Sequence, residues 1–202
     1  ECAMVLSAYI PQHKGEIDGG VDIPLERVTC CYTADSPILT IPRSKPTPTD
    51  EAIGAYVADM IHDGDTFQLG IGGLPDAVGK HLFARNDLGI HSELFSSTMA
   101  DLIEKGNVTG RYKTVDPGES IACFALGDDH LYKTLSETHS CRIMPASYTN
   151  DPFIIARQDH MISVNTALEM DLTGQICSES IGAVQWSGTG GASDFAFGAL
   201  HS

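Results

Sequence analysis

A glycine-rich turn followed by a carboxylate is the part of this sequence best suited to chemistry. The turn, GIGGLP at Gly70–Pro75, stands between an apolar stretch and a helix-like stretch, and Glu93 follows 23 positions after Gly70. Glycines at such a turn let backbone N–H groups approach an anion, and the helix dipole adds to the attraction. Two chemistries fit this pattern. Glu93 could bind the ribose of a dinucleotide held by the turn, or it could itself be a nucleophile.

Pro75 weakens the dinucleotide interpretation. The dinucleotide fingerprint ends in Gly or Ala, which lets the helix pack closely on the strand, whereas this turn ends in proline. The sequence also has no P-loop lysine pattern. Taken alone, the turn fits a dinucleotide, another phosphate ligand or a plain structural turn about equally well.

A second glycine turn, SGTGGASDF at Ser187–Phe195, changes this balance. A single dinucleotide-binding fold needs no further glycine loop so late in the chain. Two glycine loops with a carboxylate between them suit an elongated ligand and an oxyanion hole, because such loops present N–H groups without side-chain obstruction. Two unrelated tight turns are the simpler alternative.

Other residues give weaker signals for a site. Glu169 is the rival acid, but it shares one face of a predicted strand with Asp171, so an exposed polar face explains both. The histidines and the six cysteines show no metal-ligand spacing, and no serine stands in a G-x-S-x-G elbow. We therefore expect no metal site and no serine nucleophile.

Composition excludes several classes of partner. The formal net charge of −15 argues against nucleic acid and anionic membranes, and no apolar run approaches the roughly 18 residues of a membrane span. The cysteines form no disulfide framework, which favours reduced thiols. We expect a cytoplasmic protein with neither a nucleic-acid nor a membrane partner.

The proline-rich segment Ile41–Asp50 reads as a linker. We therefore assign residues 1–46 to the end of a preceding domain and its linker, and residues 47–202 to the domain that carries the glycine turns. The chain begins as if an element were already under way and stops directly after a helix-like run. These ends predict a fragment of a longer protein.

Short apolar runs alternate with helix-like stretches along the second segment. Strands are expected at Cys2–Ala8, Thr66–Leu69, Leu88–His91, Ile121–Leu126, Cys141–Met144, Met161–Asn165, Ala167–Leu172 and Gln175–Ser178, with a further extended piece at Glu26–Tyr32. Helices are expected after a cap at Thr49 or Asp50, from Pro75, at Met99–Lys105, at His130–Glu137, from Asp151 to Arg157, and after the second glycine turn. The alternation predicts an α/β fold with a mostly parallel sheet and flanking helices. Both glycine turns and Glu93 should lie at the carboxyl ends of the strands, where such sheets bind ligands.

Five ordered motifs resemble a known family. They are GIGGLPDAV (Gly70–Val78), DLGIHSELFS (Asp87–Ser96), NDPFIIA (Asn150–Ala156), NTALEMDLTGQICSESIG (Asn165–Gly182) and SGTGGASDFAFGA (Ser187–Ala199). Together they resemble the acetyl-CoA hydrolase/transferase family, most closely its 4-hydroxybutyrate and butyryl-CoA:acetate CoA-transferases. The resemblance covers Asp50–Ser202 well and the first 49 residues loosely.

The resemblance implies a NagB/CoA-transferase-like fold in which this chain is the second of two similar domains. The family's catalytic glutamate matches Glu93, and its later CoA contacts match Leu168 and Gly191, with Gly190 beside them. Its CoA-binding loop matches Gly70, Ile71, Gly72, Gly73 and Leu74. Close relatives carry Gln in place of Glu169, which speaks against that rival acid. They also commonly have Ser-Asp-Gly where this chain has Ser96-Ser97-Thr98.

The implied activity is a family I CoA-transferase with ping-pong kinetics. It would move CoA between a short-chain acyl-CoA (4-hydroxybutyryl, butyryl or acetyl) and a carboxylate such as acetate, through a glutamyl-CoA thioester on Glu93. The N–H groups of Ile71, Gly72 or Gly190 would hold the oxyanion. Coenzyme A enters as the acyl-CoA substrate, with no metal, and the full-length protein is expected to be a homo-oligomer. An acyl-CoA hydrolase on the same scaffold and a dinucleotide-binding α/β domain are the alternatives.

Overall fold

The computed structural model describes residues 18–19, 24–30 and 37–202. The expected strand Cys2–Ala8 lies outside these residues. Before the linker, the described part contains β1 (Asp18–Gly19) and a single 3-10 turn, η1 (Leu25–Arg27), where an extended piece was expected. Within the described ranges, no helix is long and apolar enough to cross a membrane.

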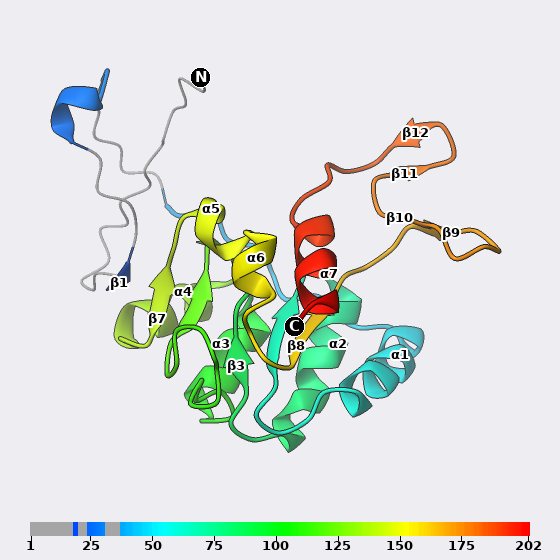
Figure 1. Cartoon of the computed structure of the whole chain (residues 1–202), viewed down its shortest axis with the longest axis horizontal. Helices are drawn as coiled ribbons and strands as arrows, with labels where there is room; N and C mark the ends of the chain where they lie inside the picture. Colours follow the sequence, from blue (N-terminus) through cyan, green and yellow to red (C-terminus); the bar gives the residue numbers. More distant parts are fainter. Residues whose placement is uncertain (1–17, 20–23, 31–36) are drawn as a thin grey trace.

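A parallel sheet forms the centre of the fold (Figure 1). Its strands are β1, β2 (Thr66–Leu69), β3 (Gly89–Ile90), β5 (Ser120–Ala122), β7 (Cys141–Ile143) and β8 (Met161–Val164). Three strands pair in the order β3-β2-β8 and three in the order β1-β7-β5, all of them parallel. A parallel bridge between His91 and Ile121 joins the two groups. The mostly parallel α/β fold expected from the alternation is confirmed.

The expected helices follow the strands in the expected order, with shifted ends, and α5 (Ala146–Thr149) is an additional short helix that the sequence did not predict. The expected helices are α1 (Pro48–Asp59), α2 (Gly73–His81), α3 (Ser97–Glu104), α4 (Asp129–Glu137), α6 (Pro152–Ile155) and α7 (Ala192–Leu200), with the 3-10 turn η2 (Leu82–Ala84) after α2. Thr47 caps α1, earlier than expected, because its hydroxyl accepts from the Asp50 N–H while the Asp50 carboxylate accepts from the Thr47 N–H. Pro75 is the third residue of α2 and not the first.

The main core lies where the first four helices pack in a row against the strands. Phe67, Ile90 and Phe95 are fully buried in it, together with apolar residues of α3 and α4. Helices α1 and α2 cross so closely that a Cβ at Gly54 would lie 2.9 Å from Ala77. A second, smaller core joins Phe195 of α7 to Ile155 of α6 and Met161 of β8. These contacts fix both glycine turns relative to the sheet.

The two central strands of the sheet, β3 and β5, are both interrupted beside Glu93. The strand expected at Ile121–Leu126 divides into β5 and β6 (Phe124–Ala125), and β3 resumes after a bend as β4 (Leu94–Phe95). At the break the Glu93 carbonyl accepts from the N–H groups of Cys123 and Phe124, at 3.0 and 3.3 Å. Glu93 therefore lies in the bend between β3 and β4, whereas the sequence predicted that it follows the end of a strand.

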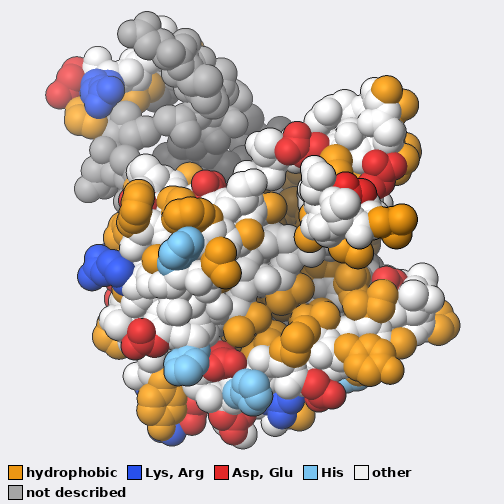
Figure 2. All heavy atoms as spheres, turned by 45° about the vertical axis from the view of Figure 1, so that its right-hand side comes forward, with side chains coloured by type: hydrophobic (Ala, Val, Ile, Leu, Met, Phe, Trp, Pro, Cys, Tyr) orange, Lys and Arg blue, Asp and Glu red, His pale blue; other side chains and the backbone are white. Residues whose placement is uncertain are grey.

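Residues 169–185 form an arm that stands away from the sheet (Figure 1). The arm consists of two antiparallel hairpins, made by β9 (Glu169–Met170) with β10 (Ile176–Cys177) and by β11 (Ser180–Ile181) with β12 (Val184–Gln185). The expected strands in this region are thus shorter than predicted and pair with each other. Hydrophobic side chains are exposed along the arm (Figure 2), among them Met170, Leu172 and Ile176.

Candidate active site

The Glu93 side chain reaches across the fold to the second glycine loop. Glu93 is partly buried, and its Oε2 accepts a hydrogen bond of 3.0 Å from the backbone N–H of Gly191. Gly191 is the N-cap of α7, so the carboxylate lies at the positive end of that helix. The bend at the Glu93 backbone and the start of α7 together orient this carboxylate.

The backbone at Gly190 and Gly191 is packed too tightly for side chains. A Cβ on Gly191 would lie 2.4 Å from Asn150 Nδ2 and 2.8 Å from Glu93 Oε2. Gly190 has a φ of +52° and a Cβ there would lie 3.7 Å from Glu93 Oε2. The side chain of Asn150, the C-cap of α5, therefore packs directly against Gly191.

A cleft of about 340 Å³ opens beside this carboxylate. Its lining residues are Gln68, Gly70, Ile71, Glu93, Leu94, Asn165, Thr166, Ser178, Ser187, Gly188, Thr189, Gly190, Gly191 and Ala192. Glu93 is the single charged residue among these lining residues, and the others are glycines, small polar residues and a few apolar ones. As formed by the described residues, the cleft therefore suits an uncharged part of a ligand that lies next to the Glu93 carboxylate.

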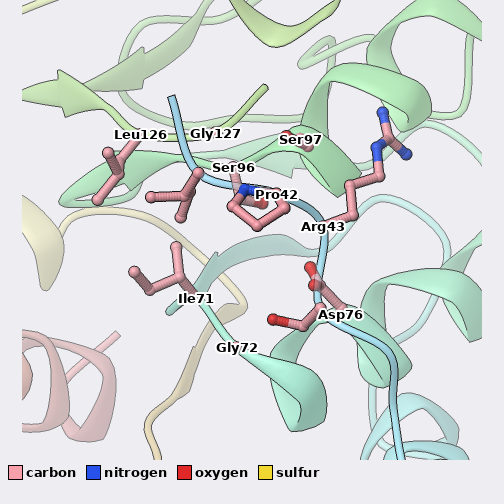
Figure 3. Close-up of a pocket in the computed structure, with 11 residues that line it drawn as sticks. Pro42, Arg43, Ile71, Gly72, Asp76, Ser96, Ser97, Leu126 and Gly127 are labelled. Atoms are coloured by element: carbon pink, nitrogen blue, oxygen red, sulfur yellow. The ribbon is translucent and has the colours of Figure 1, made fainter. Parts of the chain in front are cut away.

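The first glycine loop separates this cleft from a smaller pocket of about 20 Å³. Gly72 is the N-cap of α2 and has a φ of +114°, a conformation that favours glycine. Figure 3 shows Ile71 and Gly72 facing the linker residues Pro42 and Arg43 across the small pocket. Ile71 lines both cavities and so lies between them.

Not all of the proposed ligand contacts meet in the cleft. The structure brings together Glu93 and the four residues Gly70, Ile71, Gly190 and Gly191. Gly73 packs against the start of α1, where a Cβ would lie 3.1 Å from Asp50 Oδ2, and Leu74 packs on the main core. Leu168, at the base of the arm, is 42% exposed and is not among the cleft residues.

The linker is fastened over the first glycine loop by one arginine. Arg43 contacts Asp101 of α3 through its terminal nitrogens and Asp128, the N-cap of α4, through Nε at 2.6 Å. These two carboxylates raise the pKa of Arg43, so the guanidinium stays charged. Beside it, the Ile41 N–H donates to the Gly127 carbonyl. The loop is thus held between the linker and the sheet.

Comparison with known proteins identifies the family. Residues 127–202 match the model of the acetyl-CoA hydrolase/transferase C-terminal domain. The chain is 41% identical over 180 residues to the succinyl-CoA:cyclohexane-1-carboxylate CoA transferase of Geobacter metallireducens, an alignment that covers 89% of this chain and 41% of that protein. It is 36% identical over 199 residues to the 4-hydroxybutyrate coenzyme A transferase of Clostridium kluyveri, covering 98% of this chain and 46% of that protein. The chain belongs to the acetyl-CoA hydrolase/transferase family.

The fold agrees with the family's solved structures. The 4-hydroxybutyrate CoA-transferase of Porphyromonas gingivalis superimposes with a TM-score of 0.79 at 35% identity, over 92% of this chain and 44% of that one. The chain therefore spans less than half the length of each of these three relatives. This agrees with the expectation of one part of a longer protein.

The segment Ser96-Ser97-Thr98, where the resemblance implies a different turn in relatives, is held by hydrogen bonds at the start of α3. Ser96 is the N-cap of α3, and Ser97 Oγ donates to the Asp128 carboxylate and accepts from its N–H. Thr98 Oγ1 donates to Asp76 of α2 at 2.8 Å. The Ser97 and Thr98 hydroxyls therefore tie α3 to α4 and α2, directly after the strand that follows Glu93, while the Ser96 hydroxyl caps α3 by accepting from the Met99 N–H.

His91 is a buried neighbour of Glu93 that sequence reasoning considered only as a metal ligand. Its Nε2 lies 2.9 Å from the Thr149 carbonyl, its Nδ1 is buried without a partner, and its ring lies against those of Tyr148 and Phe195. Burial, and then the charge of Lys113, lower the pKa of His91 to about 4. His91 is therefore a neutral packing residue at pH 7. Within the described residues, no group of three His, Cys, Asp or Glu side chains could hold a metal ion.

The rival acid Glu169 has a structural contact in the arm. Its Oε1 accepts from the Gly182 N–H at 3.0 Å and it is exposed, while Asp171 accepts from the N–H groups of Thr173 and Gln175 in the next turn. Neither carboxylate lines the cleft. Their placement agrees with the exposed polar face expected from the sequence.

Proposed function

We propose that the full-length protein is a CoA-transferase that uses Glu93 as its nucleophile. It moves CoA between a short-chain acyl-CoA and a carboxylate such as acetate. The single observation that carries this proposal is the position of the Glu93 carboxylate, partly buried in an otherwise uncharged cleft between two glycine loops. The names of the relatives, all CoA-transferases, support the same reaction.

The reaction begins with attack of a Glu93 carboxylate oxygen on the thioester carbonyl of the acyl-CoA. The C–S bond breaks, which gives a mixed anhydride and free CoA thiolate. The thiolate then attacks the glutamyl carbonyl carbon of the anhydride, and the bond between that carbon and the bridging oxygen breaks. A glutamyl-CoA thioester and the free carboxylate of the first substrate result. The acceptor carboxylate runs both steps in reverse and leaves as the new acyl-CoA.

The two glycine loops supply the groups that this chemistry requires. Each attack places negative charge on a carbonyl oxygen, and the N–H groups of Ile71, Gly72 or Gly190 would hold it. One such donor typically contributes about 3–4 kcal/mol to transition-state stabilisation. Gly191 orients the attacking carboxylate. CoA contacts at Gly70–Leu74, Leu168, Gly190 and Gly191 are part of this proposal.

Steady-state kinetics of the full-length protein test the proposal. We expect parallel lines in double-reciprocal plots of acyl-CoA against acetate, and loss of transfer in Glu93→Gln. Glu169→Gln, which changes an exposed carboxylate of the arm in the same way, is the matched control and should keep its activity. Release of free acid without an acceptor would instead indicate the hydrolase alternative. An active Glu93→Gln variant would remove Glu93 from the chemistry.

Several finer statements stay predictions. The family I mechanism, homo-oligomerisation of the full-length protein, a cytoplasmic location and the boundary between residues 46 and 47 rest on the sequence and its resemblance. Titration with CoA and with NAD addresses the dinucleotide alternative, since CoA binding without NAD binding supports the proposed function.

A further inference from the structure

Three polar side chains form a connected group beside the cleft. Gln68 stands on β2 and Ser163 stands opposite it on β8, while Asn165 follows β8 directly. Ser163 Oγ donates to Gln68 Oε1 at 3.0 Å, Asn165 Nδ2 donates to Ser163 Oγ at 2.8 Å, and Gln68 Nε2 donates to Asn165 Oδ1 at 3.4 Å. We call these three residues the amide triad. Gln68 and Asn165 both line the cleft.

The amide triad has capacity left for a ligand. Each of its two amide nitrogens carries two N–H groups and donates one of them within the triad. Each amide oxygen accepts one bond within the triad and has a second lone pair. Gln68 is only 4% exposed, which fixes its orientation, whereas Asn165 stands at the exposed rim.

These groups complement a neutral ligand that both donates and accepts. A secondary amide does so, because its N–H needs an acceptor and its carbonyl needs a donor. A carboxylate or phosphate is a poorer match, since either would prefer a cation or donors alone, and the lining residues of this cleft include no Lys or Arg. Acyl-CoA carries such amides in its pantetheine arm, on the thiol side of the reacting carbonyl.

We propose that the amide triad binds the pantetheine amide nearest the thioester and thereby positions the reacting carbonyl at Glu93. The Asn165 amide oxygen accepts from the ligand N–H, and the free N–H of Gln68 donates to the ligand carbonyl. Binding energy gained at this amide is used to orient the thioester, so its loss lowers kcat/KM. This inference rests on the proposed CoA-transferase function.

The test compares two thioesters on the full-length protein. S-butyryl-N-acetylcysteamine keeps the amide, whereas S-butyryl 2-mercaptoethyl acetate has an ester oxygen in place of the amide N–H. We expect Asn165→Ala to lower kcat/KM about 10–100-fold for the amide substrate and less than about threefold for the ester. Gln68→Leu should lower kcat/KM for both substrates, because both keep the carbonyl that its N–H contacts. Gln175→Leu, in the exposed arm, is the matched control and should change neither value.

Two further measurements separate loss of the proposed contact from misfolding of a variant and from recognition of the acyl group. Gln68 is buried, so the kinetics of Gln68→Leu count only if its melting temperature equals that of the wild type. Asn165 is exposed, so Asn165→Ala tests the amide contact without depending on the packing of the core. Equal losses on amide and ester in Asn165→Ala, or no loss, would overturn the amide contact while Glu93-dependent transfer continued. A loss confined to 4-hydroxybutyryl-CoA compared with butyryl-CoA would assign the triad to the acyl group and overturn it too. Absence of transfer in the wild type would overturn the proposed function itself.

Discussion

Gly191 donates its backbone N–H to Oε2 of Glu93 over 3.0 Å, although 98 residues separate them in the chain. This bond joins the proposed nucleophile to the start of α7, and it depends on the absence of a side chain at Gly191. The donor is a main-chain group, so its own position does not depend on a side-chain rotamer. The predictions below concern the parts of the fold that hold this contact and its surroundings.

Gly191→Ala should lower kcat about 100-fold, because the new Cβ would meet Asn150 Nδ2 at 2.4 Å and Glu93 Oε2 at 2.8 Å. The nucleophile must then move away from its position. Gly188→Ala in the same loop is the comparison variant, since a Cβ there meets no atom within 4 Å and should cost far less. The measurement is kcat of both full-length variants. Equal losses of kcat would show that any substitution in this loop is harmful and that the contact between Gly191 and Glu93 has no special role.

Arg43→Met should lower the melting temperature of the full-length protein by about 3 °C at low salt. Arg43 bridges two carboxylates from different helices, an arrangement that contributes about 1 kcal/mol. The difference should shrink in 1 M NaCl, because salt screens partly exposed pairs. Lys80→Met breaks a single exposed pair with Glu51 and should cost less. Identical melting temperatures for the two variants at low salt would contradict this stabilising role of Arg43.

His91 should make the protein sensitive to acid. Its pKa is about 4 in the folded state and about 6.5 in the unfolded chain, so between these values the unfolded state binds more protons. Stability from this group is complete above pH 6.5 and is lost as pH falls toward 4, by up to about 1.4 kcal/mol per pH unit. Melting temperatures from pH 7 to pH 4.5 should fall less steeply in His91→Asn. Parallel curves for wild type and variant would rule out this role.

The sequence indicated the fold well because alternating βα units are a local pattern. Thr66–Leu69 and the helix after Gly72 follow from apolar runs and turn residues that neighbour each other in the chain. The bend at Glu93 could not be found in this way. It depends on Cys123 and Phe124, which lie at the break between β5 and β6 and donate to the Glu93 carbonyl.

Some features of the site were likewise predictable from local sequence, whereas others depend on contacts between distant parts of the chain. The glycines near the reacting carboxylate were expected from their type, since two glycine loops carry a recognisable pattern. The contact of Gly191 with Glu93 and the support from Asn150 needed the packing of α5 and α7. Gln68 left one signal that was overlooked, a polar residue inside a strand in which every residue is buried. The arm was misread because its short hairpins have the same apolar runs as strands of the sheet.

The central claim is that Glu93 carries CoA as a thioester during turnover. Full-length protein exposed to butyryl-CoA without acceptor, treated with borohydride and digested, should yield a peptide whose Glu93 side chain is reduced to the alcohol. The same treatment without acyl-CoA should leave it unchanged. An unmodified Glu93 in protein that still transfers CoA would contradict the account.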